Sequence, residues 1–284
     1  MATFYNQATL TYNGVTTTSN TTTGQLVDVL SAGKSLLVDS YTAGQELTYI
    51  ITLVNSGTTA FTDLTVTDNL GSYTYNTQTL VPLTYVTGSL QYYVNGTLQT
   101  TPTVTAASPL TVTGISVPAG GNAVIAYVAQ VNTYAPLDVN DTVVNTATIT
   151  GTGLSTPLTA TATALSAVDP TLTISKSLSP TTVSENGQIT YTFIIENSGN
   201  TAAEASAAVV VADTFDPVLN PITVTLNGTA LTLTTDYTYN PATGAFATVA
   251  GVVTVPAATY TQDTATGAWT IVPGTTTLIV TGTV

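Results

Sequence analysis

The feature that most constrains the fold of this chain is an internal repeat that runs out of phase with the chain ends. The segment GKSLLVDSYTAGQELTYIITLVNSGTTA (33–60) aligns without a gap with SKSLSPTTVSENGQITYTFIIENSGNTA (175–202), at an offset of 142 positions. Further along, VPAGGNAVIAYVAQV, ending at Val131, matches VPGTTTLIVTGTV, ending at Val284. The chain therefore contains one structural unit twice.

The first copy of this unit continues past the point at which the second copy stops. It goes on through NTYAPLDVNDTVVNTATITGTG (132–153) and a Thr/Ala-rich run, LTATATALSAV (158–168). No such continuation follows Val284, but its pattern returns at the N-terminus, where YNQATLTYNG (5–14) matches VNTATITGTG (144–153). The expected order is thus last strands, a complete unit, and a unit that lacks its last strands.

Both copies have the composition of β-strands. Thr, Val, Tyr, Leu and Ala alternate in short runs such as LTYIITLVNSG and ITYTFIIENSG, which end in turn residues. YYVNGTLQ and VTLNGTALTL carry Asn-Gly between apolar residues, the strongest short signal for a hairpin. No helical period accompanies these runs, so the sequence predicts an all-β fold.

The composition excludes several classes of function. Two Lys+Arg against fifteen Asp+Glu leave a net charge of -13, so nothing could neutralise the phosphates of a nucleic acid. Cysteine and histidine are absent, so disulfides, thiolate or imidazole metal sites and a Ser-His-Asp triad are not expected. There is no apolar run of about eighteen residues, which argues against membrane insertion. We expect no cofactor and no enzyme activity beyond autocatalytic bond formation.

Four short motifs, three of which recur in both copies, resemble a known family. They are a Lys in an early strand (GKS, SKS), the strand runs LTYIITLVNSG and ITYTFIIENSG, the triplets VTD and VAD, and a closing NTATITG. They resemble the bacterial surface repeat called domain of unknown function eleven. That resemblance implies two tandem immunoglobulin-like β-sandwiches, preceded here by a donor strand.

The duplicated, cysteine-free chain also resembles the major proteins of spore appendages in anaerobic spore-forming bacteria. This resemblance implies a structural fibre protein outside the cell, on a spore or cell surface, with an anchoring protein there as a further partner. The start MATFYNQATL lacks the features of a secretory signal, which fits release by lysis of the mother cell. The alternative is a surface adhesin, in which the repeats space a carbohydrate- or protein-binding surface.

The repeat and the resemblance together suggest the domain boundaries. Residues 1–14 are the expected donor strand, and 15–32 are a linker or a second Thr-rich strand. Residues 33–168 form the first sandwich, and 169–284 form the second, which lacks its last strands.

An incomplete sandwich exposes unpaired backbone groups beside an apolar groove, which invites an added strand. The N-terminal strand has the matching pattern, whether it acts as one strand or as a two-strand hairpin. Insertion into its own second unit would strain a linker of about twenty residues, so we expect insertion into another copy and a head-to-tail homopolymer. The expected donor residues are Phe4, Tyr5, Asn6, Ala8, Leu10 and Tyr12.

The only two basic residues occupy the same position in the two copies. One interpretation is a pair of ion pairs, Lys34 with Asp68 and Lys176 with Asp213. The other is an isopeptide bond of the kind found in immunoglobulin-like surface proteins, in which a buried, neutral Lys attacks an Asn amide beside a carboxyl group. The candidates are Lys34, Asn145 and Asp68 within the chain, and Lys176, Asp213 and Asn6 of a neighbouring copy.

One further motif is a weak candidate for a metal-binding site. LDVNDT offers Asp138, Asn140 and Asp141 as oxygen ligands for calcium. A turn is the favoured interpretation of this segment.

Overall fold

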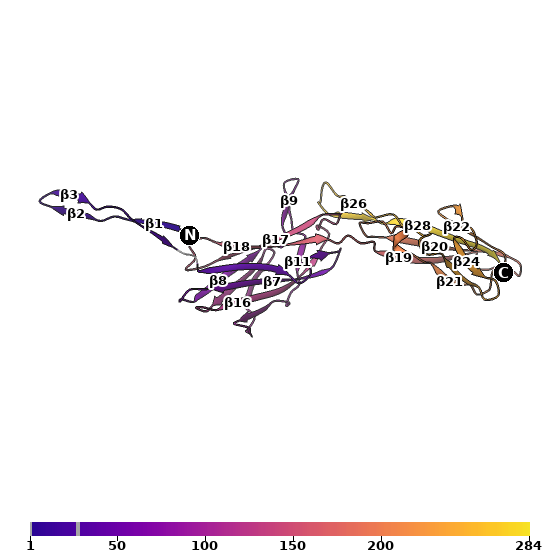
Figure 1. Cartoon of the computed structure of the whole chain (residues 1–284), viewed down its shortest axis with the longest axis horizontal. Helices are drawn as coiled ribbons and strands as arrows, with labels where there is room; N and C mark the ends of the chain where they lie inside the picture. The colour runs from indigo at the N-terminus through magenta and orange to yellow at the C-terminus, as the bar shows by residue number, and fades with distance from the viewer. Residues whose placement is uncertain (1, 27–28) are drawn as a thin grey trace. The chain divides into compact units, whose positions relative to one another are not determined.

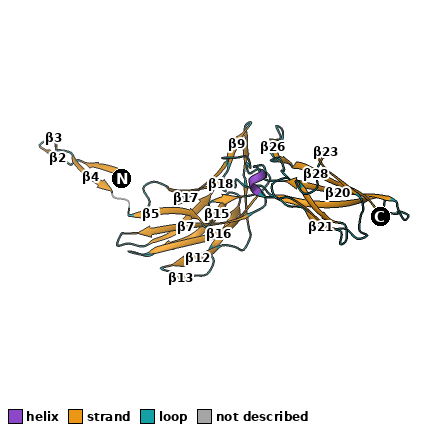
Figure 2. Ribbon diagram, turned by 45° about the vertical axis from the view of Figure 1, so that its right-hand side comes forward, coloured by secondary structure: helices purple, strands orange, loops and turns teal. Residues whose placement is uncertain are grey.

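The computed structural model describes residues 2–26 and 29–284. The chain divides into two compact units. Unit 1 comprises residues up to 135 and 142–165, and unit 2 comprises 136–141 and 166–284. Figure 2 shows strands throughout, and Ala205–Ala207 is the one helical turn in the described ranges. The predicted all-β fold is confirmed.

Unit 1 is a sandwich of two antiparallel sheets (Figure 1). The first has the order β13-β12-β16-β7-β5, with β11 also paired to β16; the second has the order β14-β15-β8-β17-β18-β6. The strands of the first are β13 (Thr97–Leu98), β12 (Gln91–Val94), β16 (Asn122–Val131), β7 (Glu46–Asn55), β5 (Leu30–Leu36) and β11 (Leu83–Tyr85). Those of the second are β14 (Thr103–Ala107), β15 (Leu110–Val117), β8 (Phe61–Asp68), β17 (Thr142–Thr150), β18 (Leu158–Ser166) and β6 (Ser40–Tyr41). A hairpin of β9 (Tyr73–Tyr75) and β10 (Gln78–Leu80) lies outside both sheets.

The core of unit 1 follows from the alternation of its strands. Every second residue of β7 is buried, from Leu47 to Leu53, because successive side chains of a strand point to opposite faces. β16 shows the same alternation, and Tyr49 stacks on Tyr127 across the two strands at 5.5 Å. Leu64 and Val66 of β8 are buried from the other sheet. The period of two in the sequence therefore determines which face of each strand becomes core.

Unit 2 is built around a five-stranded sheet with the order β19-β20-β28-β22-β23. A three-stranded sheet, β21-β25-β24, and a hairpin of β26 and β27 accompany it. The bounds are β19 (Leu172–Ser179), β20 (Gln188–Asn197), β28 (Gly274–Thr283), β22 (Ile222–Leu226), β23 (Thr229–Ala230), β21 (Ala212–Thr214), β25 (Ala245–Thr248), β24 (Tyr237–Asn240), β26 (Thr259–Gln262) and β27 (Trp269–Val272). Tyr191, Phe193, Phe215 and Phe246 are among its core residues.

The strand pairings show which parts of the two units are equivalent. β19, β20 and β28 repeat the arrangement of β5, β7 and β16, since Lys34 is opposite Ile51 and Lys176 is opposite Phe193. One detail of the sequence alignment is wrong: the counterpart of Pro118 is Pro256, and not Pro273 of the aligned VPG. Asn55 Nδ2 donates to the carbonyl of Pro118, and the equivalent Asn197 donates to Pro256, because the hairpin β26–β27 is inserted before β28. In the part of unit 2 that the structure describes, no strand takes the place of β17 or β18.

The N-terminal residues 2–26 form a long hairpin, which we call the arm (Figure 1, indigo). β1 (Ala2–Asn6) pairs with β4 (Thr22–Leu26), and β2 (Thr9–Tyr12) pairs with β3 (Val15–Thr18). Both central turn residues have positive φ, 48° at Asn13 and 77° at Gly14, as a type I′ hairpin turn requires. Among the described strands, the arm's strands pair only with one another.

Residues 15–32 were expected to be a linker or a second Thr-rich strand; they contain the second half of the arm and the start of the first sheet of unit 1. Residues 15–32 hold β3, β4 and the beginning of β5, while 27 and 28 lie outside the described residues. No helix in the described ranges has the length and apolar character needed to cross a bilayer.

Candidate functional site

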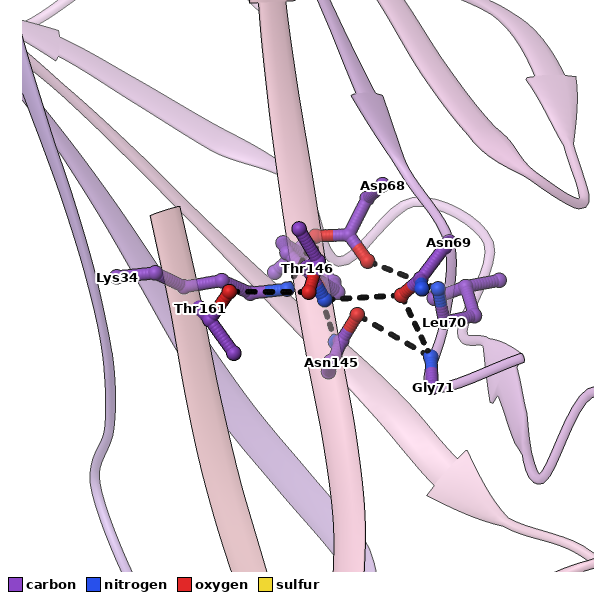
Figure 3. A network of polar contacts seen from close by, with 9 residues as sticks. Lys34, Asp68, Asn69, Leu70, Gly71, Asn145, Thr146 and Thr161 are labelled. Atoms are coloured by element: carbon purple, nitrogen blue, oxygen red, sulfur yellow. Dashed lines mark hydrogen bonds and ion pairs between the residues drawn. The ribbon is translucent and has the colours of Figure 1, made fainter. Parts of the chain in front are cut away.

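The first lysine and its aspartate meet between the two sheets of unit 1 (Figure 3). Lys34 projects from β5 of one sheet, and Asp68 ends β8 of the other. Lys34 Nζ lies 2.6 Å from Asp68 Oδ2, and the two side chains are only 0% and 1% exposed. The carboxylate also accepts hydrogen bonds from Tyr127 Oη at 2.6 Å and from the Leu70 backbone N–H at 3.0 Å. A carboxylate with three donors is well satisfied in the core.

The predicted cross-linking asparagine lies next to this pair. Asn145, on β17, is fully buried. Its Nδ2 donates to Tyr127 Oη at 3.0 Å, and its Oδ1 accepts from the Gly71 N–H at 3.3 Å. Asn69 braces the same loop, since its Oδ1 accepts from the N–H groups of Gly71 at 3.0 Å and Thr146 at 2.8 Å (Figure 3). We call Lys34, Asp68, Tyr127 and Asn145 the closed site.

Burial sets the electrostatics of the closed site. Desolvation lowers the pKa of the Lys34 ammonium from 10.5 to about 8, although the charge and hydrogen bond of Asp68 oppose that shift. Desolvation also raises the pKa of the Tyr127 hydroxyl, so this group stays protonated as a donor. The site thus holds an amine with an accessible neutral form next to a polarised carboxamide.

The second lysine and its aspartate make the same contact in a different setting. Lys176 Nζ contacts Asp213 Oδ2, but the side chains are 40% and 19% exposed. The ammonium lies over the Tyr191 ring, 4.4 Å from its centroid. Val280 pairs with Tyr191 where Tyr127 pairs with Tyr49, so the hydroxyl of the closed site has no counterpart there. We call Lys176 and Asp213 the open pair.

The strand that carries Lys176 is exposed on the side that should face the core. In β5, Ala32 and Leu36 are half-buried on the same face as Lys34. The equivalent residues of β19 are Ile174, which is 57% exposed, and Leu178, which is also exposed. Large apolar side chains on an inward face are normally covered, so this face of unit 2 is an uncovered apolar face.

The arm has an alternation of apolar side chains that could cover such a face. The side chains of residues 3–23 are all exposed. Positions two apart on its first strand share a face, as do the buried residues of β17. The arm's face carries Phe4, Asn6, Ala8, Leu10 and Tyr12, whereas Tyr5 lies on the other face, and β17 buries Val143, Asn145, Ala147 and Ile149. Residues 2–26 contain no Asp, Glu, Lys or Arg.

The structure therefore places Lys34, Asp68 and Asn145 together, and Lys176 with Asp213. Asn6 lies on the arm, which belongs to the other unit. Sequence reasoning missed Tyr127. The only signal for it was a polar hydroxyl on the inward face of an apolar strand, where the second copy has Val280.

The segment with the candidate calcium ligands forms a turn. Asp138 N–H donates to Asp141 Oδ2 at 2.9 Å, and Asn140 has a φ of 70°. The described residues contain no cluster of three or more acidic side chains that could hold a metal.

No family model and no curated protein matches the chain. Among solved structures it is similar to the pilus backbone RrgB of Streptococcus pneumoniae, with 13% identity and a TM-score of 0.36 over 86% of this chain and 55% of that one. It is similar to a fragment of the major pilin GBS80 of Streptococcus agalactiae, with 12% identity and a TM-score of 0.36 over 52% and 58%. The major pilin subunit BcpA of Bacillus cereus gives 9% identity and a TM-score of 0.37 over 95% and 73%.

The chain spans a little more than half of the two streptococcal structures. The resemblance to the bacterial surface repeat stays a prediction.

Proposed function

We propose that the protein is the structural subunit of an extracellular fibre on a spore or cell surface, in which the arm of one copy completes unit 2 of another. The observation that carries this proposal is the contrast between the two lysine sites. In unit 1, where β17 is present, Lys34 and Asp68 are shielded from solvent. In unit 2, Lys176 is 40% exposed and Asp213 is 19% exposed, and the missing strands have the pattern of the arm.

The repeat suggests the register of the insertion. In unit 1, Ala147 of β17 pairs with Asp68 of β8. The equivalent pairing brings Ala8 of the arm opposite Asp213 of β21. β21 pairs with β25 along one edge, and its other edge has no partner among the strands described. The unpaired backbone groups of such an edge can accept an added strand.

The apolar residues of the arm supply the driving force. Phe4, Leu10, Tyr12 and Val15 are 57–61% exposed in the free arm. Tyr12 pairs with Val15, so both reach the same face. Burying four such side chains contributes on the order of 6–10 kcal/mol before the entropy of association is subtracted. Because residues 2–26 carry no charge, insertion involves no cost of desolvating a charged side chain.

The short tether favours insertion into another copy. The arm ends at Leu26 and β5 begins at Leu30, so the connection spans at most about 14 Å. Self-insertion would require the end of unit 2 that receives Leu26 to come within that span of Leu30. Insertion into another copy carries no such condition. It is a head-to-tail contact that repeats without closing, which produces an open fibre.

The closed site supports an isopeptide bond between Lys34 and Asn145. The neutral amine of Lys34 attacks the Asn145 side-chain carbonyl carbon, an amide bond forms, and ammonia leaves. The Gly71 N–H polarises the carbonyl oxygen. Tyr127 Oη bridges Asp68 and Asn145 Nδ2, so the proton that the lysine loses can reach the departing nitrogen through Asp68 and Tyr127. Atoms balance as one amine plus one primary amide giving one secondary amide plus ammonia.

An amide bond formed at the open pair would join two copies; because that pair has no counterpart of Tyr127, Asp213 itself would pass the lysine proton to the departing amide nitrogen as ammonia leaves. Lys176 and Asp213 are in contact, and Asn6 of a bound arm would stand where Asn145 stands in unit 1. Each joint of the fibre would then carry a covalent bond, in a chain that has no cysteine for a disulfide.

Deleting residues 2–26 tests the proposed assembly. The shortened chain should remain monomeric by size-exclusion chromatography and form no fibres by electron microscopy. Mixed with the complete chain, it should shorten the fibres, because it still accepts an arm but donates none. Fibres of normal length from the shortened chain alone would refute the proposal.

A further inference from the structure

At one end of unit 2 lies an open pocket of about 500 Å³. It is lined by Val183, Ser184, Glu185, Asn186, Pro217 and Val284. Val183 is an aliphatic residue, yet it is 38% exposed. Val284, one of the pocket's lining residues, directly follows the end of β28.

Unit 1 has an aromatic ring at the equivalent place. Val284 N donates to the Gly187 carbonyl, and the equivalent Val131 N donates to the Gln45 carbonyl, so the two ends correspond. The residue of unit 1 that corresponds to Val183 is Tyr41, 142 positions earlier, and it is 0% exposed. A large side chain therefore fills in unit 1 what a small one leaves open in unit 2.

In the second sheet of unit 1, β18 lies between the strand of Tyr41 and the strand of Val143, and it carries a small residue opposite Val143. Tyr41 lies on β6, which neighbours β18, and Ala164 of β18 is opposite Val143 of β17. Val143 is buried and tightly enclosed, since its Cγ1 lies only 2.5 Å from where a Cβ on Gly71 would stand. This end of unit 1 has no room for a side chain larger than valine at position 143.

The arm has a large residue at the position where β17 has the small Val143. With Asn6 in the place of Asn145, the residue in the place of Val143 is Phe4, whose ring is exposed in the free arm. Opposite Phe4 stands Gly24, and the ring lies so close that a Cβ there would be 2.2 Å from it. The arm thus pairs a large residue with the smallest one, where unit 1 pairs Val143 with Ala164.

We infer that the Val183 pocket is the specificity pocket for Phe4 of a second copy, and that this size match directs the arm to unit 2 and away from unit 1. The inference rests on the proposed function and adds its selectivity element. In unit 1 the large Tyr41 is combined with the small Val143. In unit 2 the small Val183 would be combined with the large Phe4 of an incoming arm. Exchange of the arm with β17 of unit 1 would bring Phe4 to the place of Val143 against Gly71, where a larger side chain does not fit.

A size-swap experiment tests this inference in the complete chain. All variants carry Asn6→Ser, so that no joint can become covalent, and the readout is the concentration at which half of the chains are in fibres. Val183→Tyr should raise that concentration about tenfold or more, because Tyr fills the pocket. Phe4→Val should raise it about tenfold, because the pocket stays partly empty. Combining Phe4→Val with Val183→Tyr recreates the pair in unit 1 and should bring assembly back to within about threefold of the parent.

The matched control is Tyr5→Ala, which removes an aromatic ring from the opposite face of the arm and should change the concentration less than about threefold. A double variant no better than Val183→Tyr alone would overturn the specificity pocket. So would an effect of Tyr5→Ala as large as that of Phe4→Val. These outcomes are distinct from failure of the proposed function, in which deletion of residues 2–26 leaves assembly intact.

Discussion

The buried lysine of unit 1 is the residue whose environment is hardest to explain by packing alone. An ammonium in the core costs several kcal/mol of desolvation, and a single carboxylate partner repays this only with good geometry. Lys34 has that geometry, yet its pKa is still lowered to about 8. A lysine that forms an amide with Asn145 carries no charge, so the bond would remove the cost that the burial creates.

Mass spectrometry of the intact chain tests this bond. The folded Asn6→Ser chain, which forms no bond between copies, should be lighter than its sequence mass by one ammonia, because the Asn145 amide nitrogen leaves. Lys34→Met and Asp68→Asn should both restore the full sequence mass. Tyr127→Phe keeps the ring but removes the proton path, so it should slow the loss of ammonia at least about tenfold. Full mass in the folded parent chain would contradict the reaction.

The ion-pair alternative has its own signature in the pH dependence of unit 1. A free Lys34 has a folded pKa of about 8 and an unfolded value of 10.5, so between these pH values the unfolded state binds more protons. The unfolding free energy relative to Lys34→Met would then rise by up to about 3 kcal/mol from pH 8 to 10.5. A bonded Lys34 does not titrate, and the difference should stay flat.

At the scale of elements, unit 1 has a hairpin that has no counterpart in the described part of unit 2. β17 and β18 complete the second sheet of unit 1, where β17 lies between β8 and β18. Unit 2 has only the short β21 at the equivalent edge, and the inward face of β19 is exposed. Without a strand beside β21, unit 2 lacks the backbone hydrogen bonds of that edge, and the apolar side chains of β19 stay in contact with water. Unit 2 should therefore be the less stable unit when no arm is bound.

Calorimetry of the chain without residues 2–26 should therefore show two unfolding transitions. The lower one belongs to unit 2, and a stability deficit of each kcal/mol lowers its midpoint by roughly 4 °C. In fibres of the complete chain the lower transition should move up by more than about 10 °C, because a bound arm stabilises only the folded unit. An unchanged lower transition in fibres would show that the arm does not bind unit 2.

For the whole molecule, charge opposes assembly. Each copy carries a net charge of -13, so two copies repel each other as they approach. The arm itself is uncharged, which keeps this repulsion out of the contact surface. The repulsion acts over distances comparable to the Debye length, about 30 Å at 0.01 M salt and about 8 Å at 0.15 M.

Fibre growth should consequently speed up with added salt. We expect the elongation rate to rise several-fold between about 0.01 M and about 0.15 M NaCl, while the dissociation rate changes little, because the buried contact is apolar. Light scattering or time-resolved electron microscopy would measure this. A rate that falls with salt would indicate that complementary charges, and not the uncharged arm, form the contact.

Much of this architecture could be predicted from particular residues. The alternation in LTYIITLVNSG predicts β7 and its buried face, and the Asn-Gly of VNGT predicts the turn between β12 and β13. The alignment of Lys34 with Lys176 indicated two equivalent sites. The role of Tyr127 was not predictable in the same way. Its hydroxyl acts through hydrogen bonds with Asp68 and Asn145, which are distant in sequence and lie on the facing sheet.

The sequence by itself determined the strand pattern, the duplication and its phase, because alternation and repetition are local properties that a single chain displays. Only the tertiary structure decided that one lysine is buried and the other exposed, that the arm is a two-strand hairpin, and that a pocket stands where unit 1 has Tyr41. Burial and cavities arise from how sheets face one another, and that arrangement is a property of the packed fold, which no single segment encodes.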